Sequence, residues 1–179
     1  TPVPNQGGVN LFDELQMFSG SQDRFDYKLV GRKEMYIPYN AYRFYFGCEQ
    51  QEQFMKNHAN PACERWELHR VWEVEATLKP GQRHVYSKRT YYLDEDTFGI
   101  GLYDAWDQAD ALYRSLFLSG VQIYDKTIPY NVKNVSYDFN KNMYALVNDA
   151  LKGGYRFHDK PKSERDMSPE AIVSMETQC

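Results

Sequence analysis

The segment from residue 66 to residue 78 has the clearest alternation of hydrophobic and polar positions in the chain. The hydrophobic set is interrupted by one arginine and consists of Trp66, Leu68, Arg70, Trp72, Val74, Ala76 and Leu78. The positions between them carry Glu67, His69, Glu73, Glu75 and Thr77. A period of two residues is typical of a β-strand with one covered face. We therefore predict a strand over residues 66–78.

The sequence KPGQ at residues 79–82 predicts a type II turn, because Pro and Gly occupy its two central positions. A tight hairpin at this turn pairs residues whose numbers sum to about 161. Such a register places Glu73 opposite Lys88, Trp72 opposite Arg89 and Arg70 opposite Tyr91. It is favoured because it pairs opposite charges on one face and stacks arginine on aromatic rings on the other.

A second turn, DEDT at residues 94–97, leads into a further strand. A tight connection there adds side chains to the same covered face, namely Phe98, Ile100, Leu102, Asp104 and Trp106. Gly99 and Gly101 then lie on the opposite face, where a missing side chain lets a neighbour approach.

The rest of the chain divides into an irregular arm over residues 1–23 and a single antiparallel β domain over residues 24–179. Gly31 indicates a bulge and Pro38 a strand end or an edge position. Residues 47–63 are polar and predict a loop or short helix that caps one edge of the sheet. We expect strands over residues 111–126 and 129–150, and a short helix that begins after Ser168, with Pro169 at its first position.

The composition narrows the possible partners of the chain. Of 179 residues, 16% are aromatic and 15 are tyrosines, which favours strands and a binding surface. The net charge is −4 and no cluster of Lys or Arg forms, so nucleic acid is not an expected partner. No apolar run approaches the about 18 residues of a transmembrane segment. The start, TPVPNQGG, lacks Met and a signal-peptide pattern, which predicts a mature or trimmed fragment.

Cys48 and Cys63 bracket the polar loop, and Cys179 ends the chain. A disulfide between the first two would close about 16 residues and contribute about 3 kcal/mol in the chain-entropy model. The alternative is two unrelated thiols in a cytosolic protein. The spacing fits no zinc motif.

The sequence contains no recognisable catalytic motif, so we predict a protein that is not an enzyme and that needs neither a cofactor nor a metal. None of the four histidines stands in a nucleophile-elbow or HExxH setting. Asp94, Glu95 and Asp96 resemble part of a calcium loop, but the remaining ligand positions are absent, which favours a solvated turn. A hydrolase would require His58 or His158 to meet carboxylates in the folded protein.

The predicted covered face contains three charged residues, Arg70, Arg89 and Asp104. Each needs a partner, because an unpaired buried charge costs several kcal/mol. One interpretation is internal pairing, with Asp104 near Arg89 and both arginines on aromatic rings. The other is a cavity in which Arg70 and Arg89 hold the polar head of an apolar ligand. The candidate ligand-binding residues are Trp66, Leu68, Arg70, Trp72, Arg89, Tyr91, Phe98, Ile100, Leu102 and Trp106.

The stretches YKLVGRKEMYIPYNAYRF and ERWELHRVWEVEATLKPGQRHVYSKRTYYLDEDT closely resemble the domain of unknown function 1329 family. Members are proteobacterial envelope proteins described as outer-membrane-lipoprotein-sorting-like, and they are longer than this chain. The resemblance implies the C-terminal part of such a protein, in the periplasm. It also implies a curved antiparallel half-barrel similar to the carriers LolA, LolB and LppX, whose concave face shelters acyl chains.

The resulting hypothesis is a periplasmic carrier for a lipid-like ligand. An oxidising periplasm would also suit a bridge between Cys48 and Cys63. The resemblance further implies an RND-type transporter and an outer-membrane protein as partners. The alternative is a structural adaptor of an RND-type export complex, in which the apolar face is an interface with the transporter or with another part of the same protein.

Overall fold

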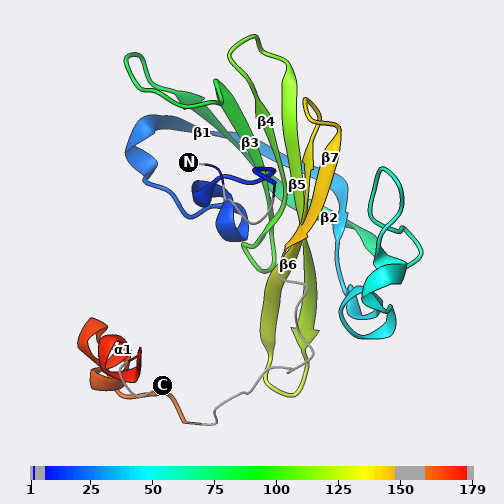
Figure 1. The fold of residues 1–179 in the computed structure, drawn as a ribbon, viewed down its shortest axis with the longest axis vertical. Helices are drawn as coiled ribbons and strands as arrows, with labels where there is room; N and C mark the ends of the chain where they lie inside the picture. Colours follow the sequence, from blue (N-terminus) through cyan, green and yellow to red (C-terminus); the bar gives the residue numbers. More distant parts are fainter. Residues whose placement is uncertain (1, 3–6, 148–159, 177–179) are drawn as a thin grey trace. The chain divides into compact units, whose positions relative to one another are not determined.

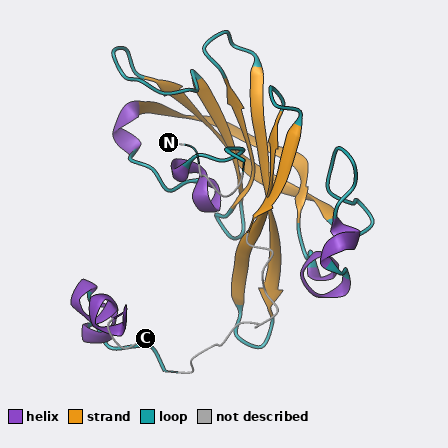
Figure 2. Ribbon diagram, viewed as in Figure 1, coloured by secondary structure: helices purple, strands orange, loops and turns teal. Residues whose placement is uncertain are grey.

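A computed structural model describes residues 2, 7–147 and 160–176 of the chain, which divides into two compact units, residues 1–149 and residues 150–179. The first unit is a single antiparallel sheet in which each strand pairs with the next one along the chain (Figures 1 and 2). Its strands are β1 (Phe25–Pro38), β2 (Trp66–Leu78), β3 (Lys88–Asp94), β4 (Ile100–Trp106), β5 (Leu112–Ile123), β6 (Ile128–Asp138) and β7 (Met143–Val147). The predicted mainly β, antiparallel meander is confirmed.

One face of the sheet, which we call the arm face, is covered by the N-terminal arm. The arm contains two short 3₁₀ helices, η2 (Phe12–Met17) and η3 (Gln22–Arg24), and η3 leads directly into β1 (Figure 1). Leu11 and Met17 of the arm are buried in one hydrophobic cluster with sheet residues of the arm face, which include Ala76, Tyr91, Tyr103 and Leu116. Within the region predicted as an irregular arm, Leu11 and Met17 thus belong to the core.

The opposite face, which we call the disulfide face, is covered by residues 41–63. This segment holds a short π-helix, η4 (Arg43–Gly47), and a 3₁₀ helix, η5 (Gln50–Gln53), and a disulfide joins Cys48 to Cys63. Both cysteines pack with Phe44 against Phe117 of β5 and Val135 of β6. The segment was predicted to cap an edge of the sheet. It covers a face instead, because its apolar residues need more apolar surface than an edge offers.

The predicted register between β2 and β3 is wrong by four residues. Ala76 pairs with Arg89 and Trp72 pairs with Leu93, and the exposed Arg70 lies opposite Glu34 of β1. The KPGQ turn does form, since Gln82 N donates to Lys79 O at 3.1 Å and Gly81 has φ +81°. Residues 83–87 then leave the strand before β3 begins, and this detour shifts the pairing. The shift is an even number, so the assignment of β2 and β3 residues to faces is retained.

The predicted assignment of β4 side chains to the same face as the β2 pattern is correct for Ile100 and wrong for the residues after it. A bulge between the pairs Tyr92–Leu102 and Leu93–Ile100 moves Leu102, Asp104 and Trp106 to the disulfide face. Asp104 accordingly accepts a hydrogen bond from Ser115 at 2.7 Å and does not meet Arg89. The expected close approach at Gly101 is confirmed, because a Cβ there would lie 3.1 Å from the Ile37 side chain.

The second unit contains a 3₁₀ turn, η6 (Arg165–Met167), and one helix, α1 (Pro169–Glu176). Ser168 Oγ accepts a hydrogen bond from the backbone N–H of Ala171 at 3.2 Å, so the predicted N-cap is confirmed. Within the described parts of the chain, every helix is too short or too polar to traverse a bilayer.

Candidate functional site

A buried carboxylate, Glu14, fixes the arm to the sheet. Its side chain is fully buried and accepts four hydrogen bonds, from the backbone N–H of Leu11 (2.6 Å), from Arg114 (2.9 Å), from the hydroxyl of Tyr103 (2.7 Å) and from the hydroxyl of Tyr86. Arg114, buried as well, also pairs with Asp138 at 3.1 Å. Burial and the charge of Glu14 raise the pKa of Tyr86 well above its ordinary value, so its hydroxyl keeps its proton.

A second ionic cluster, beside the first, joins Asp13 of the arm to Arg89 and His84. The backbone N–H of Tyr86 donates to His84 Nδ1 at 3.1 Å, and His84 Nε2 lies 2.9 Å from the Asp13 carboxylate and 2.7 Å from a guanidinium nitrogen of Arg89. Arg89 donates to the same carboxylate and lies over the rings of Phe25 and Tyr86, at 4.8 and 5.0 Å from their centroids. Burial raises the pKa of Asp13, but the hydrogen bonds and charges of His84 and Arg89 outweigh it and hold the pKa well below its ordinary value.

The lowered pKa of Asp13 predicts a loss of stability in acid. Because the folded pKa lies below the unfolded one, the stabilisation is fully present above the unfolded value of about 4 and is lost as pH falls through the folded value. We expect Asp13→Asn to unfold at lower urea concentration than the wild type at pH 7. This gap should narrow steadily below about pH 4. A gap that stays constant with pH would show that the Asp13 charge contributes nothing.

The arm fixed in this way forms one wall of an apolar groove on the arm face. The Phe18 ring meets the Tyr91 ring edge-on, with centroids 6.0 Å apart. The groove has a volume of about 160 Å³, and six of its seven lining residues are apolar or aromatic: Phe18, Gln22, Tyr27, Val74, Tyr91, Leu93 and Ile100. A water-accessible groove with so little polar lining is suited to an apolar ligand.

Apolar residues continue from the groove across β1. Leu29, which is 59% exposed, lies directly opposite Val74. The next pairs along the two strands are charged or aromatic, and Arg32 lies over the Trp72 ring at 4.9 Å. Arg32 and Arg70 both pair with Glu95, at 2.7 and 2.5 Å. The arm face therefore passes from an apolar region to a charged one along β1 and β2.

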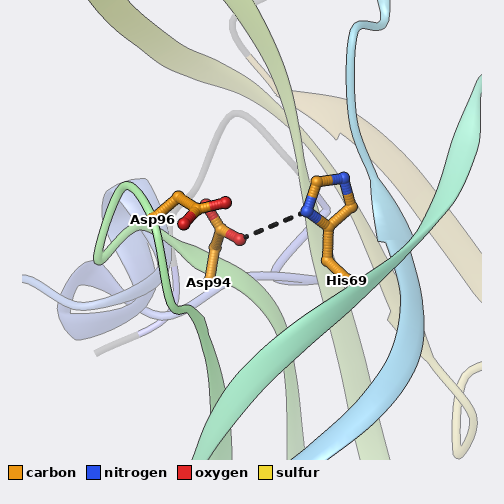
Figure 3. A group of neighbouring side chains, drawn as sticks. All are labelled: His69, Asp94 and Asp96. Carbon is orange, nitrogen blue, oxygen red and sulfur yellow. Dashed lines mark ion pairs between the residues drawn. The ribbon is translucent and has the colours of Figure 1, made fainter.

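On the disulfide face, His69, Asp94 and Asp96 bring their ligand atoms within 4.8 Å of one another (Figure 3). His69 comes from β2, Asp94 ends β3 and Asp96 lies in the β3–β4 turn. The His69 ring stacks on Tyr39, with centroids 3.9 Å apart. Burial first, and then the charges of Asp94 and Asp96, raise the pKa of Tyr39 to about 12.

Comparison with known proteins identifies the family of this chain. The family model described as "Protein of unknown function (DUF1329)" matches residues 1–173. The chain belongs to the DUF1329 family. This DUF1329 chain is also 39% identical over 168 residues to the uncharacterized protein PA3922 of Pseudomonas aeruginosa. The match covers 92% of the chain and 37% of the relative, so the chain spans little more than a third of that protein. The family resemblance noted from the sequence is confirmed.

Two solved structures are similar to this DUF1329 chain. One is a candidate outer membrane lipoprotein-sorting protein domain from Vibrio parahaemolyticus, with 12% identity, a TM-score of 0.44 and coverage of 87% of this chain and 51% of the other. The second is a DUF1329 family protein from Desulfovibrio piger, with 16% identity, a TM-score of 0.44 and coverage of 92% and 58%.

The structure separates the ligand-binding residues that the sequence predicted for this DUF1329 chain. Tyr91 and Ile100 line the groove, and Arg89 lies on the same face in its ion pair with Asp13. Trp72, Arg70 and Leu68 extend along β2 on that face, where Leu68 is 55% exposed. The others lie elsewhere: Leu102 and Trp106 on the disulfide face, Trp66 against the Phe117 ring, and Phe98 in the β3–β4 turn, 69% exposed.

Several groove residues of the DUF1329 chain were not among the sequence candidates, namely Phe18, Tyr27, Val74 and Leu93. Val74 belongs to the alternating pattern of β2, and Phe18 ends the apolar stretch NLFDELQMF of the arm. That apolar stretch is the sequence signal from which a contact between the arm and the sheet could have been predicted. For the hydrolase interpretation, His58 Nδ1 lies 2.8 Å from the carbonyl oxygen of Ala59, and His158 lies outside the described residues.

Proposed function

We propose that this DUF1329 chain binds the apolar part of a lipid-like ligand in the groove between the arm and the sheet, as a carrier or binding protein without catalysis. The observation that carries the proposal is the apolar lining of the groove, in which Gln22 is the one polar side chain among the described residues that form it. Removing an acyl chain from water is favourable by about 0.8 kcal/mol for each CH₂ group.

The size of the groove sets the extent of this contact. Its volume of about 160 Å³ is below the about 300–1,000 Å³ of typical ligand pockets, so the groove holds only part of a long chain. Leu29 of β1 offers the next apolar surface, beside Val74. The charged pair formed by Arg70 and Glu95 lies further along β2, where a polar head group would find partners. Arg70 is exposed, whereas Arg89 is buried in its ion pair with Asp13 and is therefore not proposed as a head-group contact.

We propose the periplasm as the compartment of this function. The support is the disulfide between Cys48 and Cys63, because disulfides persist in oxidising compartments such as the bacterial periplasm and are rare in the cytosol.

An aspartate in the groove should prevent ligand binding. We expect Val74→Asp to weaken the binding of a dansyl-labelled fatty acid at least tenfold, because an acyl chain in the groove would displace water from the new carboxylate without offering it a hydrogen bond. The measurement is a fluorescence titration of the protein at its full natural length. Leu29→Asp, at an exposed position of the same surface, should weaken binding less and provides a second variant with little risk to folding.

The matched control is Leu112→Asp, which places the same charge on a 43% exposed leucine at the start of β5. Circular dichroism checks that each variant is folded. Binding that is equal in the wild type, Val74→Asp and Leu29→Asp would remove the groove from the ligand site. A wild type that takes up no fatty acid, and that carries no lipid in native mass spectrometry, would favour the adaptor of an RND-type complex, for which exposed Leu29, Tyr36 and Leu68 would be contacts.

A further inference from the structure

The cluster of His69, Asp94 and Asp96 on the disulfide face has no role in lipid binding on the arm face. Its residues converge from β2, from the end of β3 and from the following turn, and Figure 3 shows the Asp94 carboxylate directed at the His69 ring. The arrangement depends on the observed register, since His69 lies two residues from Val71, the strand partner of Asp94. An acidic turn alone is common at protein surfaces, so the interest of this cluster lies in the buried Asp94 and the half-buried His69.

One oxygen of Asp94 is buried and without a hydrogen-bond donor. Oδ2 accepts hydrogen bonds from the backbone N–H and the hydroxyl of Thr97, at 3.0 and 2.7 Å. Oδ1 has no hydrogen-bond partner among the described residues, although the side chain is only 3% exposed. His69 Nδ1 lies 3.6 Å from this oxygen, beyond hydrogen-bonding distance. A buried carboxylate oxygen in this state is costly unless a cation compensates it.

The His69 ring is held so that Nδ1 faces this oxygen. Its other nitrogen, Nε2, lies 3.5 Å from Glu67 Oε2, and its face stacks on Tyr39. Glu67 is itself oriented by Asn40 at 3.0 Å and by Arg65 at 2.7 Å. A carboxylate behind the second nitrogen of an imidazole is the arrangement that orients histidine ligands of metal ions.

We propose that His69 Nδ1, Asp94 Oδ1 and the Asp96 carboxylate bind one divalent transition-metal ion, with Glu67 as the orienting partner of His69. Two ligands that each lie about 2.1 Å from one ion are about 3.4 Å apart at a tetrahedral angle, close to the separation of 3.6 Å between Nδ1 and Oδ1. Asp96 is exposed and lies in a turn, so its carboxylate can close on the ion.

The donor set selects the class of ion. One imidazole nitrogen and two carboxylate oxygens suit Zn²⁺ or Mn²⁺, whereas Ca²⁺ takes 6–8 oxygen ligands. An ion at this position would tie β2 to the β3–β4 turn. It would also accept a water molecule as a further ligand, because three protein ligands leave a position open.

The competing account is a His69 side chain that bridges Glu67 and Asp94 without any metal ion. The two accounts differ in metal binding at neutral pH. We expect isothermal titration of the full natural protein, freed of any polyhistidine tag, to show one Zn²⁺ or Mn²⁺ per chain. His69→Gln and Asp96→Asn should each weaken that affinity at least tenfold. Bound Mn²⁺ should also change its electron paramagnetic resonance spectrum.

Asp96→Asn is the decisive variant, because Asp96 is exposed and its replacement does not threaten the fold. Asp94→Asn is less suitable, since Asp94 Oδ2 holds Thr97 in the turn. Asp125→Asn, at an exposed acid in the β5–β6 turn, is the matched control and should bind as the wild type does. No binding of either ion by the wild type, or binding that His69→Gln and Asp96→Asn leave unchanged, would overturn the proposal. Neither result affects fatty-acid binding in the groove, so the two proposals fail separately.

Discussion

Replacing Glu14 with glutamine should lower the free energy of unfolding by about 3–5 kcal/mol, the usual cost of removing one partner from a buried ion pair. The glutamine side chain has nearly the same shape as glutamate, but it is neutral and no longer forms an ion pair with Arg114. Its amide NH₂ group would also face hydrogen-bond donors, because Glu14 is surrounded by groups that donate to it. For a protein of this size, each kcal/mol corresponds to about 2–4 °C in Tm. The expected decrease in Tm is therefore about 6–20 °C, and urea unfolding followed by circular dichroism measures it.

The matched control for Glu14 is Glu34→Gln, which removes the same charge from an exposed position on β1. We expect this variant to unfold within about 0.5 kcal/mol of the wild type. Because Phe18 follows η2 directly, Glu14→Gln should also expose the groove, and the intrinsic fluorescence of the protein should change. Equal stability of Glu14→Gln and Glu34→Gln would mean that the arm is held by its apolar contacts alone.

The disulfide carries the second large effect. Replacing both Cys48 and Cys63 with serine should reduce stability by about 3 kcal/mol, because the unfolded chain regains the freedom of the closed loop. Dithiothreitol should lower the urea midpoint of the wild type by a similar amount and leave the double variant unchanged. That pair of measurements separates loss of the bridge from loss of packing by the two sulfur atoms.

The segment should stay on the sheet even when the disulfide is reduced. Lys133 of β6 is buried beneath it and donates to the carbonyl oxygen of Phe44 at 2.7 Å and to the Gln53 side chain. The Phe44 ring lies 4.0 Å from the same ammonium group. We therefore expect the reduced protein to unfold in a single transition at lower urea concentration. A separate early transition would show that the disulfide alone holds residues 41–63.

The strands of this fold could be predicted from the sequence because they depend on local patterns. The alternation over residues 66–78, the bulge at Gly31 and the turn at Gly81 each follow from the conformational preferences of the residues concerned. The register of β3 could not be predicted in the same way. His84 and Tyr86 leave the strand to meet Asp13 and Glu14, which are more than 70 residues away in sequence, and local reasoning has no access to that contact.

The same limit applies to the candidate sites. Arg89 was correctly expected to need a partner, but the partner is Asp13 of the arm and not Asp104, because the bulge in β4 turns Asp104 to the other face. Asp94 and Asp96 were visible in the sequence as an acidic turn. Their proximity to His69 emerges only from the pairing of β2 with β3, so local sequence reasoning could not place a histidine beside this turn.

The strand β1 ends the sheet on one side, and the way it is built affects how this molecule can meet others. Outer strands with unpaired backbone groups invite a second chain to add a strand. The bulge at Gly31 breaks the regular spacing of backbone hydrogen-bonding groups along β1, and the charged residues Arg32 and Lys33 follow it. Pro38 at the end of the strand has no backbone N–H to donate. The outer side of β1 is thus a poor template for strand addition. Recognition of another molecule on the β1 side would depend on side chains such as Leu29 and Tyr36, and single substitutions could tune it.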